Sequence, residues 1–360
     1  MKNIIEYIKD KSYYLLGGIV VVIILLIIIN ACSNSSGSYD KIEQKMVNAA
    51  KNYYASHEKN LPKEENGTVK VTISTLIESE LLKEVKDPNN KDQDCSGYVE
   101  VTKVGKEYSY TPFLVCKGNY EPKYLTDIVK SSKQDEYGNG VYEMGSEYVY
   151  RGDDVKNYVS FNNQLWRIIK VDSEGDIKLV SAKYLDFTSS WSTVYNPLSG
   201  YNSGQTNDYL NTDIRKTLTN YYEDNFDNDD KAKMIAKNLC IGSYDEGDTF
   251  DAQKECAKVK ENEKVGLLVL SDYKNASLDS RCLSLGDPEC SNYNYLSSSE
   301  IITWSLNSFS GNDYEEFIIN GNISKNPASI SYSINPVIYL TSKSIVNDGN
   351  GEEESPYIIK

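Results

Sequence analysis

Histidine is almost absent from this sequence, whose 360 residues contain only His57. A Ser-His-Asp triad, a Cys-His pair or a zinc site built from several histidines therefore cannot form in the long segment after it. No two cysteines stand in a CxxC pair, which argues against a zinc ribbon or a thioredoxin-like motif. His57 follows a predicted amphipathic helix, so we expect it to be a surface side chain.

Positive charge is also scarce, because 38 Lys and Arg residues face 53 Asp and Glu residues and leave a net charge of -15. This balance argues against nucleic acid as a partner and against docking flat on anionic lipid. It favours solubility in an exposed layer and tolerance of cations.

Polar side chains are nearly missing from residues 13–31, which give way to a Ser-rich segment. At 1.5 Å per helical residue the run spans about 28 Å, close to the hydrocarbon thickness of a bilayer. We therefore predict a single-pass transmembrane helix within a membrane-anchor segment, residues 1–32. The protein would lie in the cell membrane, with Lys2, Lys9 and Lys11 in the cytoplasm and the C-terminal part extracytoplasmic.

A second interpretation of the same segment is a lipoprotein signal. Residues 29–32, Ile-Asn-Ala-Cys, resemble a bacterial lipobox except for the polar Asn30. Cleavage there would leave Cys32 lipidated at the new N-terminus. The apolar run is longer than a usual signal h-region, which favours the uncleaved helix. Both interpretations stay open at this point.

Six of the seven cysteines lie in the predicted exported part, where disulfides persist. Six cysteines allow 15 connectivities, and the sequence alone does not choose among them. Pairing between near neighbours in sequence would join Cys95 with Cys116, Cys240 with Cys256, and Cys282 with Cys290.

The membrane-proximal part, residues 38–119, has the pattern of a helix followed by a small sheet. Asp40 and Glu43 form a plausible capping pair, and residues 98–104 and 108–115 alternate as two strands of a hairpin. This outline resembles type IV pilins and pseudopilins. The prepilin cleavage motif of that family is absent, so the resemblance implies a pilin-like domain on an ordinary anchor.

Residues 120–140 are polar and broken by Ser and Gly, which predicts a linker. Beyond it, residues 141–360 alternate strand clusters with helical patterns, which predicts an α+β domain. Strands are expected at 158–161, 164–171 and 176–181, with Asn320-Gly321 as the strongest short hairpin signal. Helices are expected around Leu218 and again around residues 234–239, and a strand at 265–271.

A family resemblance in this larger domain rests on five segments: Tyr209 to Asn211, Asp229 to Lys231, Gly266 to Ser271, Trp304 to Leu306 and Ile334 to Leu340. Residues 141–345 resemble an uncharacterised bacterial surface domain, whose members end on Gly-Val-Arg-Pro-Ala-Leu-Trp-Leu. The resemblance implies a fold similar to C-type-lectin-like and formylglycine-generating-enzyme-like domains. Asn335 stands where that family usually has Arg, so a role tied to the Arg does not carry over.

One segment has the ligand types that calcium prefers. Oxygen-bearing side chains recur at Asp87, Asn90, Asp92 and Asp94, directly before Cys95. The segment lacks the Gly and distal Glu of an EF-hand, which favours a solvated turn over a calcium loop. Calcium is the only cofactor that the sequence indicates, and it remains a hypothesis.

The sequence assigns no catalytic residue and no ligand-binding residue. The favoured function is a surface binding or adhesion module for a glycan or a protein. The alternatives are an extracytoplasmic enzyme that acts on cell-wall or glycan material through carboxylates, and a minor pseudopilin-like component of a secretion apparatus. Two convergent carboxylates in a cleft would favour the enzyme.

Overall fold

The computed structural model describes residues 38–192, 209, 212–310 and 315–360. The chain divides into a first unit, Met1–Pro122, and a second unit, Lys123–Lys360. Each unit has its own hydrophobic core, and the two cores share no residue. The fold is a mixture of helices and mainly antiparallel strands, which confirms the predicted α+β class.

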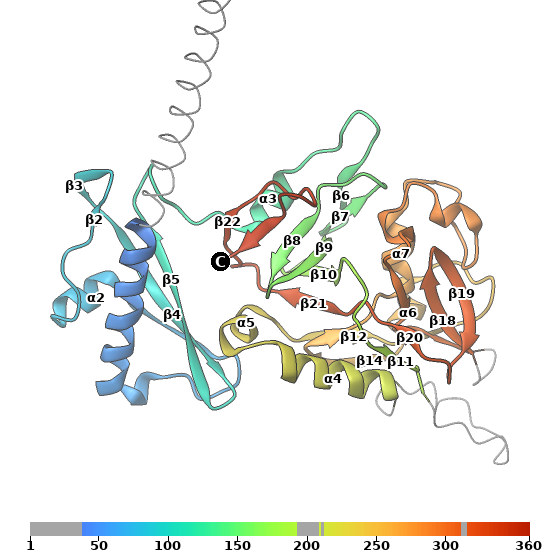
Figure 1. The fold of residues 1–360 in the computed structure, drawn as a ribbon, viewed down its shortest axis with the longest axis horizontal. Coiled ribbons are helices and arrows are strands. Elements are labelled where there is room, and N and C mark those ends of the chain that lie inside the picture. The colour runs from blue at the N-terminus through green and yellow to red at the C-terminus, as the bar shows by residue number, and fades with distance from the viewer. Residues whose placement is uncertain (1–37, 193–208, 210–211, 311–314) are drawn as a thin grey trace, which may run out of the picture. The chain divides into compact units, whose positions relative to one another are not determined.

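A helix over residues 38–56 packs on a three-stranded antiparallel sheet in the first unit, as the blue ribbon in Figure 1 shows. Met46, Ala50 and Tyr54 on one face of the helix are buried against Val99 and Val101 of the sheet. The apolar residues whose spacing predicted a helix therefore form its buried face. His57 follows the helix end and is exposed, as expected.

The other elements of the first unit lie between this helix and Pro122. They are η1 (Glu58–Asn60), β1 (Thr68–Thr72), α2 (Ile73–Glu78), β2 (Lys86–Asp87), β3 (Asn90–Asp94), β4 (Ser96–Val104) and β5 (Glu107–Val115). The sheet order is β1-β4-β5, and β4 pairs with β5 from Ser96 opposite Val115 to Val104 opposite Glu107. The predicted hairpin is confirmed.

The predicted linker, residues 120–140, is not a linker along its whole length. Helix α3 (Leu125–Ser131) lies inside it, and Leu125 and Val129 are fully buried in the core of the second unit. Leu125 and Val129 lie one helical turn apart on the same face. The polar residues around them suggested a linker, so the sequence did not predict this helix.

A nine-stranded sheet forms the centre of the second unit, with the order β15-β21-β10-β9-β8-β23-β22; β7 also pairs with β9, and β6 pairs with β7. Figure 1 shows the C-terminal red strands beside the green ones, because β21 pairs with β10 and β23 with β8. The strands are β6 (Gly140–Met144), β7 (Glu147–Arg151), β8 (Tyr158–Phe161), β9 (Gln164–Val171), β10 (Ile177–Ser181), β15 (Val265–Gly266), β21 (Val337–Leu340), β22 (Val346–Asp348) and β23 (Tyr357–Ile359).

Helices and small sheets surround this centre. The helices are α4 (Asp213–Asn225), α5 (Asn228–Lys233), α6 (Ala252–Glu255), α7 (Leu270–Ala276), η3 (Pro288–Ser291) and η4 (Tyr295–Ser297). The strands are β11 (Thr188–Ser189), β12 (Lys237–Cys240), β13 (Ser243–Tyr244), β14 (Val259–Glu263), β16 (Ile302–Trp304), β17 (Ser308–Phe309), β18 (Glu315–Asn320), β19 (Asn322–Pro327) and β20 (Tyr332–Ser333). Asn320 and Gly321 turn β18 into β19, as predicted.

Two predicted elements of the second unit are wrong. Residues 234–239 are not helical, because β12 pairs there with β14. The apolar run at 265–271 is a strand only over its first two residues, and α7 begins within it at Leu270.

Among the described residues, no helix has the length and apolar character that a membrane crossing needs. The predicted transmembrane run, residues 13–31, and the candidate lipidation site Cys32 lie outside the described residues.

Candidate functional site

A pocket of about 650 Å³ opens on the second unit. Its walls come from the end of β9 and the turn after it, from β10 and β12, from α6 and the start of α7, and from Tyr339 on β21. Seven charged residues line it, so we call it the charged pocket.

Lys237 at the start of β12 is held by three carboxylates of the β9–β10 turn. Its Nζ lies 2.8 Å from Asp172 Oδ2, 2.5 Å from Glu174 Oε2 and 2.6 Å from Asp176 Oδ2. Burial lowers the pKa of Lys237, but hydrogen bonds to the three carboxylates outweigh burial and raise that pKa above its ordinary value. The ammonium therefore stays protonated and neutralises part of the acidic cluster.

This cluster is the one place in the described part of the chain where three carboxylates gather within 4.8 Å of one another. A metal ion there would have to displace the Lys237 ammonium. We therefore interpret the cluster as an internal ion pair that ties β12 to the β9–β10 turn.

Lys178 of β10 and Asp272 of α7 form a buried ion pair beside the pocket. Lys178 Nζ lies 2.6 Å from Asp272 Oδ2, and the two side chains are 5% and 4% exposed. The same Asp272 oxygen accepts the backbone N–H of Val269 at 3.0 Å. Burying two charges is favourable only when each has its partner, so this pair fixes the start of α7 on the sheet.

Glu255 at the end of α6 is the carboxylate of the pocket wall with a raised pKa. Burial raises the pKa, and hydrogen bonds from Ser271 oppose the rise. Glu255 Oε1 accepts the Ser271 hydroxyl at 2.6 Å, and Oε2 accepts the Ser271 backbone N–H at 3.1 Å. A carboxyl group with a raised pKa in a pocket is a candidate general acid.

The remaining acid of the wall, Glu147, also has a partner, because Lys170 Nζ lies 2.7 Å from its Oε1. Asn275 of α7 differs from these residues. Its side-chain amide lines the pocket and, within the described residues, makes no hydrogen bond. It therefore leaves one donor group and one acceptor for a ligand.

All six predicted disulfide cysteines are paired as near neighbours in the structure. The Cα–Cα distances are 4.4 Å for Cys95–Cys116, 4.4 Å for Cys240–Cys256 and 4.6 Å for Cys282–Cys290. Cys240 and Cys256 also line the charged pocket, where their bond holds β12 beside the end of α6.

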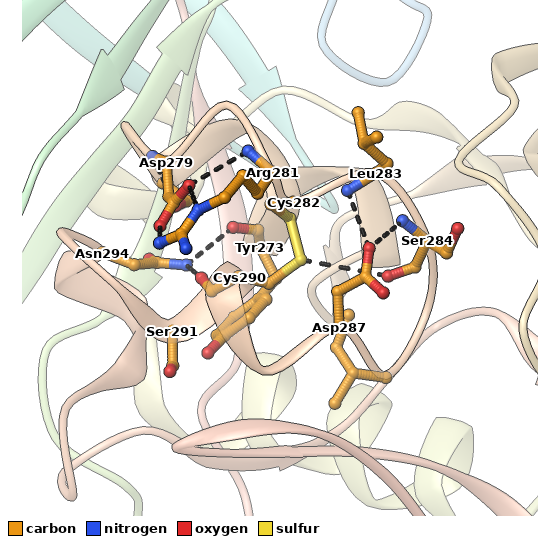
Figure 2. Close-up of a disulfide and its surroundings, with 12 residues drawn as sticks. Tyr273, Asp279, Arg281, Cys282, Leu283, Ser284, Asp287, Cys290, Ser291 and Asn294 are labelled. Atoms are coloured by element: carbon orange, nitrogen blue, oxygen red, sulfur yellow. Dashed lines mark hydrogen bonds and ion pairs between the residues drawn. A yellow bond between two sulfur atoms is a disulfide. The ribbon is translucent and has the colours of Figure 1, made fainter.

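Figure 2 shows the loop that the third disulfide closes. Asp279 binds the Arg281 side chain through both oxygens, at 3.0 Å to Nε and 2.6 Å to Nη2. Farther along, Asp287 accepts the backbone N–H groups of Leu283 and Ser284. These contacts give a structural role to the Cys282–Cys290 loop.

The predicted calcium ligands do not converge. Asp87 is fully buried and accepts hydrogen bonds from Tyr39, Asn89 and Asn119, whereas Asp94 pairs with Lys86 at 2.5 Å. Asn90 accepts the backbone N–H of Asp92 within the β2–β3 hairpin.

Contacts within the protein thus already engage the side-chain oxygens of Asp87, Asn90 and Asp94. Burial raises the pKa of Asp87, but the bonds from Asn119, Asn89 and Tyr39 bring it below its ordinary value. Calcium binding by this segment stays a prediction.

In comparisons with known proteins, no family model, no curated protein and no solved structure matches this chain. The charged pocket must therefore be interpreted from its own chemistry.

The sequence did contain one signal for the pocket. Lys178 interrupts the apolar residues of strand β10, in which all five residues are buried. A lysine at such a position needs a buried partner. The partner Asp272 and the Lys237 cluster come from distant segments, so the sequence pattern alone did not reveal them.

Proposed function

We propose that the chain is a membrane-anchored extracytoplasmic surface protein, and that it binds a neutral, hydroxyl-rich ligand of the glycan class in the charged pocket. The first unit would act as a pilin-like stalk and the second as a lectin-like binding domain.

The mutual pairing of charged side chains in the pocket wall supports this proposal. Lys170 is paired with Glu147, and Lys237 with its three carboxylates, so a strongly charged ligand would have to break an ion pair to enter. A sugar hydroxyl both donates and accepts, so it can add hydrogen bonds to paired groups without separating them. Asn275 supplies an amide with free donors and a free acceptor for the same purpose.

Two further observations support the proposed extracytoplasmic location and membrane anchor. Three disulfides suit an oxidising environment outside the cytoplasm. The apolar run at residues 13–31 has the length of a membrane anchor.

A glycan array tests the proposal, with the full chain solubilised in detergent and with and without a calcium chelator. We expect retention on a defined set of neutral glycans that the chelator does not abolish. If the chelator abolishes retention, glycan binding depends on a calcium ion, which would contradict binding by the charged pocket alone. An array without any retained glycan would contradict glycan binding and favour a protein ligand.

An enzyme is the second candidate, because Glu255 combines burial, a raised pKa and a place in the pocket wall. Glu255 would act as the general acid on a glycosidic bond. Incubation of the array-retained glycan with the full chain and analysis of the products by mass decides between the two. Cleavage that disappears in Glu255→Gln would support the enzyme, whereas unchanged glycan supports the binding module.

A further inference from the structure

Arg167 of β9 is a nearly buried cation outside the charged pocket. Its side chain is 8% exposed, and its guanidinium carbon lies 4.4 Å from the centre of the Tyr158 ring and 4.6 Å from that of Tyr295. Cation–π attraction from both rings stabilises the charge and restricts the guanidinium between them. Arg167 is not among the residues that line the charged pocket.

Among the described residues, only one of the three guanidinium nitrogens has a protein acceptor. Arg167 Nε donates to Asn157 Oδ1 at 2.9 Å, and the fully buried Asn157 is itself fixed by a bond from its Nδ2 to the Ile168 carbonyl at 2.7 Å. In the described part of the chain, Nη1 and Nη2 form neither a hydrogen bond nor an ion pair. Neither nitrogen is among the fully buried side-chain atoms without a partner, so both reach the surface, where they can donate to an acceptor from outside the chain.

Two acidic side chains lie near this guanidinium. The Tyr158 N–H donates to the Gly351 carbonyl at 2.9 Å, which brings the turn that carries Glu353 beside Tyr158, and Asp154 precedes Asn157 by three residues. Burial lowers the pKa of Arg167, and Tyr158, Tyr295, Glu353 and Asp154 oppose that effect. Both acids are exposed. Neither forms an ion pair in the described residues, and the neighbouring Lys156 pairs with Glu352 instead, at 2.6 Å.

We propose that Arg167 binds the carboxylate of a small zwitterion, a ligand that carries both a carboxylate and an ammonium group, and that Asp154 and Glu353 attract the ammonium. The planar guanidinium offers two parallel N–H donors, which match the two oxygens of a carboxylate. A purely anionic ligand would be repelled by the two acids, whereas a zwitterion satisfies both signs of charge. The site goes beyond the proposed glycan pocket and does not depend on it.

Three small probes test the site on the full chain by saturation-transfer NMR. Glycine carries both groups, whereas acetate carries only the anion and methylammonium only the cation. We expect glycine to bind more tightly than either fragment. Equal affinity for glycine and acetate, or no signal with glycine, would overturn the proposal.

Two variants locate the binding. Arg167→Lys keeps the charge but loses the two-donor geometry, so we expect glycine affinity to fall about tenfold. Arg151→Lys is the matched control, because Arg151 also lies over a tyrosine, Tyr142, but donates Nε and Nη2 to the Ser277 carbonyl. The control should leave glycine affinity unchanged, and an equal loss in both variants would contradict the assignment.

A change at the exposed acids keeps the test independent of the packing around Arg167. In Asp154→Asn combined with Glu353→Gln, glycine should bind more weakly and acetate more tightly than in the wild type. If acetate affinity does not rise, or glycine affinity does not fall, the two acids have no role in a zwitterion site and the proposal fails.

Discussion

Lys178 shows how a single residue couples the central sheet to the pocket. It stands in a fully buried strand between Ile177 and Leu179, and its ammonium reaches Asp272 at the start of α7. Without the lysine, the buried carboxylate would keep a hydrogen bond to the Val269 N–H but lose its counter-charge. The pair therefore specifies where α7 sits on the sheet, and the sheet and α7 both contribute to the pocket wall.

Replacement of Lys178 by methionine should lower the free energy of unfolding of the second unit by about 3–5 kcal/mol, because it leaves a buried charge unpaired. Urea unfolding followed by tryptophan fluorescence measures this, since all three tryptophans, Trp166, Trp191 and Trp304, lie in the second unit. In Lys178→Met combined with Asp272→Leu, most of the loss should be recovered.

A control for this prediction comes from Lys183 in the same unit, which lies 3.5 Å from Glu300, with side chains that are 61% and 46% exposed. Lys183→Met should change stability by no more than about 1 kcal/mol, since solvent screens an exposed pair. A double variant at Lys178 and Asp272 that is as unstable as the single one would show that the ion pair is not the cause.

At the scale of elements, the Cys282–Cys290 loop depends on Asp279 as well as on its disulfide. Hydrogen bonds from the Arg281 side chain lower the pKa of Asp279 strongly from its ordinary value of 3.8, with further bonds from Asn292 and the Arg281 backbone. A carboxyl group with a lowered pKa stabilises the folded state above its ordinary pKa, and this contribution is lost as the pH falls.

Asp279→Asn should therefore lower the melting temperature at neutral pH, and the difference from the wild type should shrink as the pH falls below 3.8. Thermal unfolding at a series of pH values measures it. Asp224→Asn, at an exposed position near the end of α4, is the control and should leave the pH dependence of the melting temperature unchanged. A difference that stays constant with pH would mean that the Asp279 charge does not stabilise the loop.

Local patterns predicted some elements and missed others for identifiable reasons. The β18–β19 hairpin followed from Asn320-Gly321, because turn chemistry is local. Leu239 was assigned to a helix from its spacing, but pairing of β12 with β14 and the Cys240–Cys256 bond place it in a strand. The strand at Leu239 and the Lys237 cluster both depend on contacts with residues distant in sequence. A short stretch of sequence therefore could not predict either of them.

The whole molecule has two separate cores. The first is built around the helix of residues 38–56 and the Cys95–Cys116 bond, and the second around the nine-stranded sheet. A change confined to one core should therefore leave the unfolding of the other unaffected.

Removal of the first disulfide tests this separation. Cys95→Ser combined with Cys116→Ser should destabilise the first unit by about 3 kcal/mol in the loop-entropy model. Far-UV circular dichroism should show an earlier unfolding phase, whereas the tryptophan transition, which reports on the second unit, should not move. A shift of the tryptophan transition by the same amount would mean that the chain unfolds as one cooperative body.

The glycan proposal is tested most directly by the affinity of the full chain for its array-retained glycan, measured by titration calorimetry in the wild type and in Asn275→Ala. We expect about a tenfold loss of affinity in Asn275→Ala, because two or more hydrogen bonds are removed. Asn347→Ala, at an exposed position on β22, should bind as the wild type does. Equal affinity of Asn275→Ala and the wild type would contradict the assignment of the charged pocket as the glycan site.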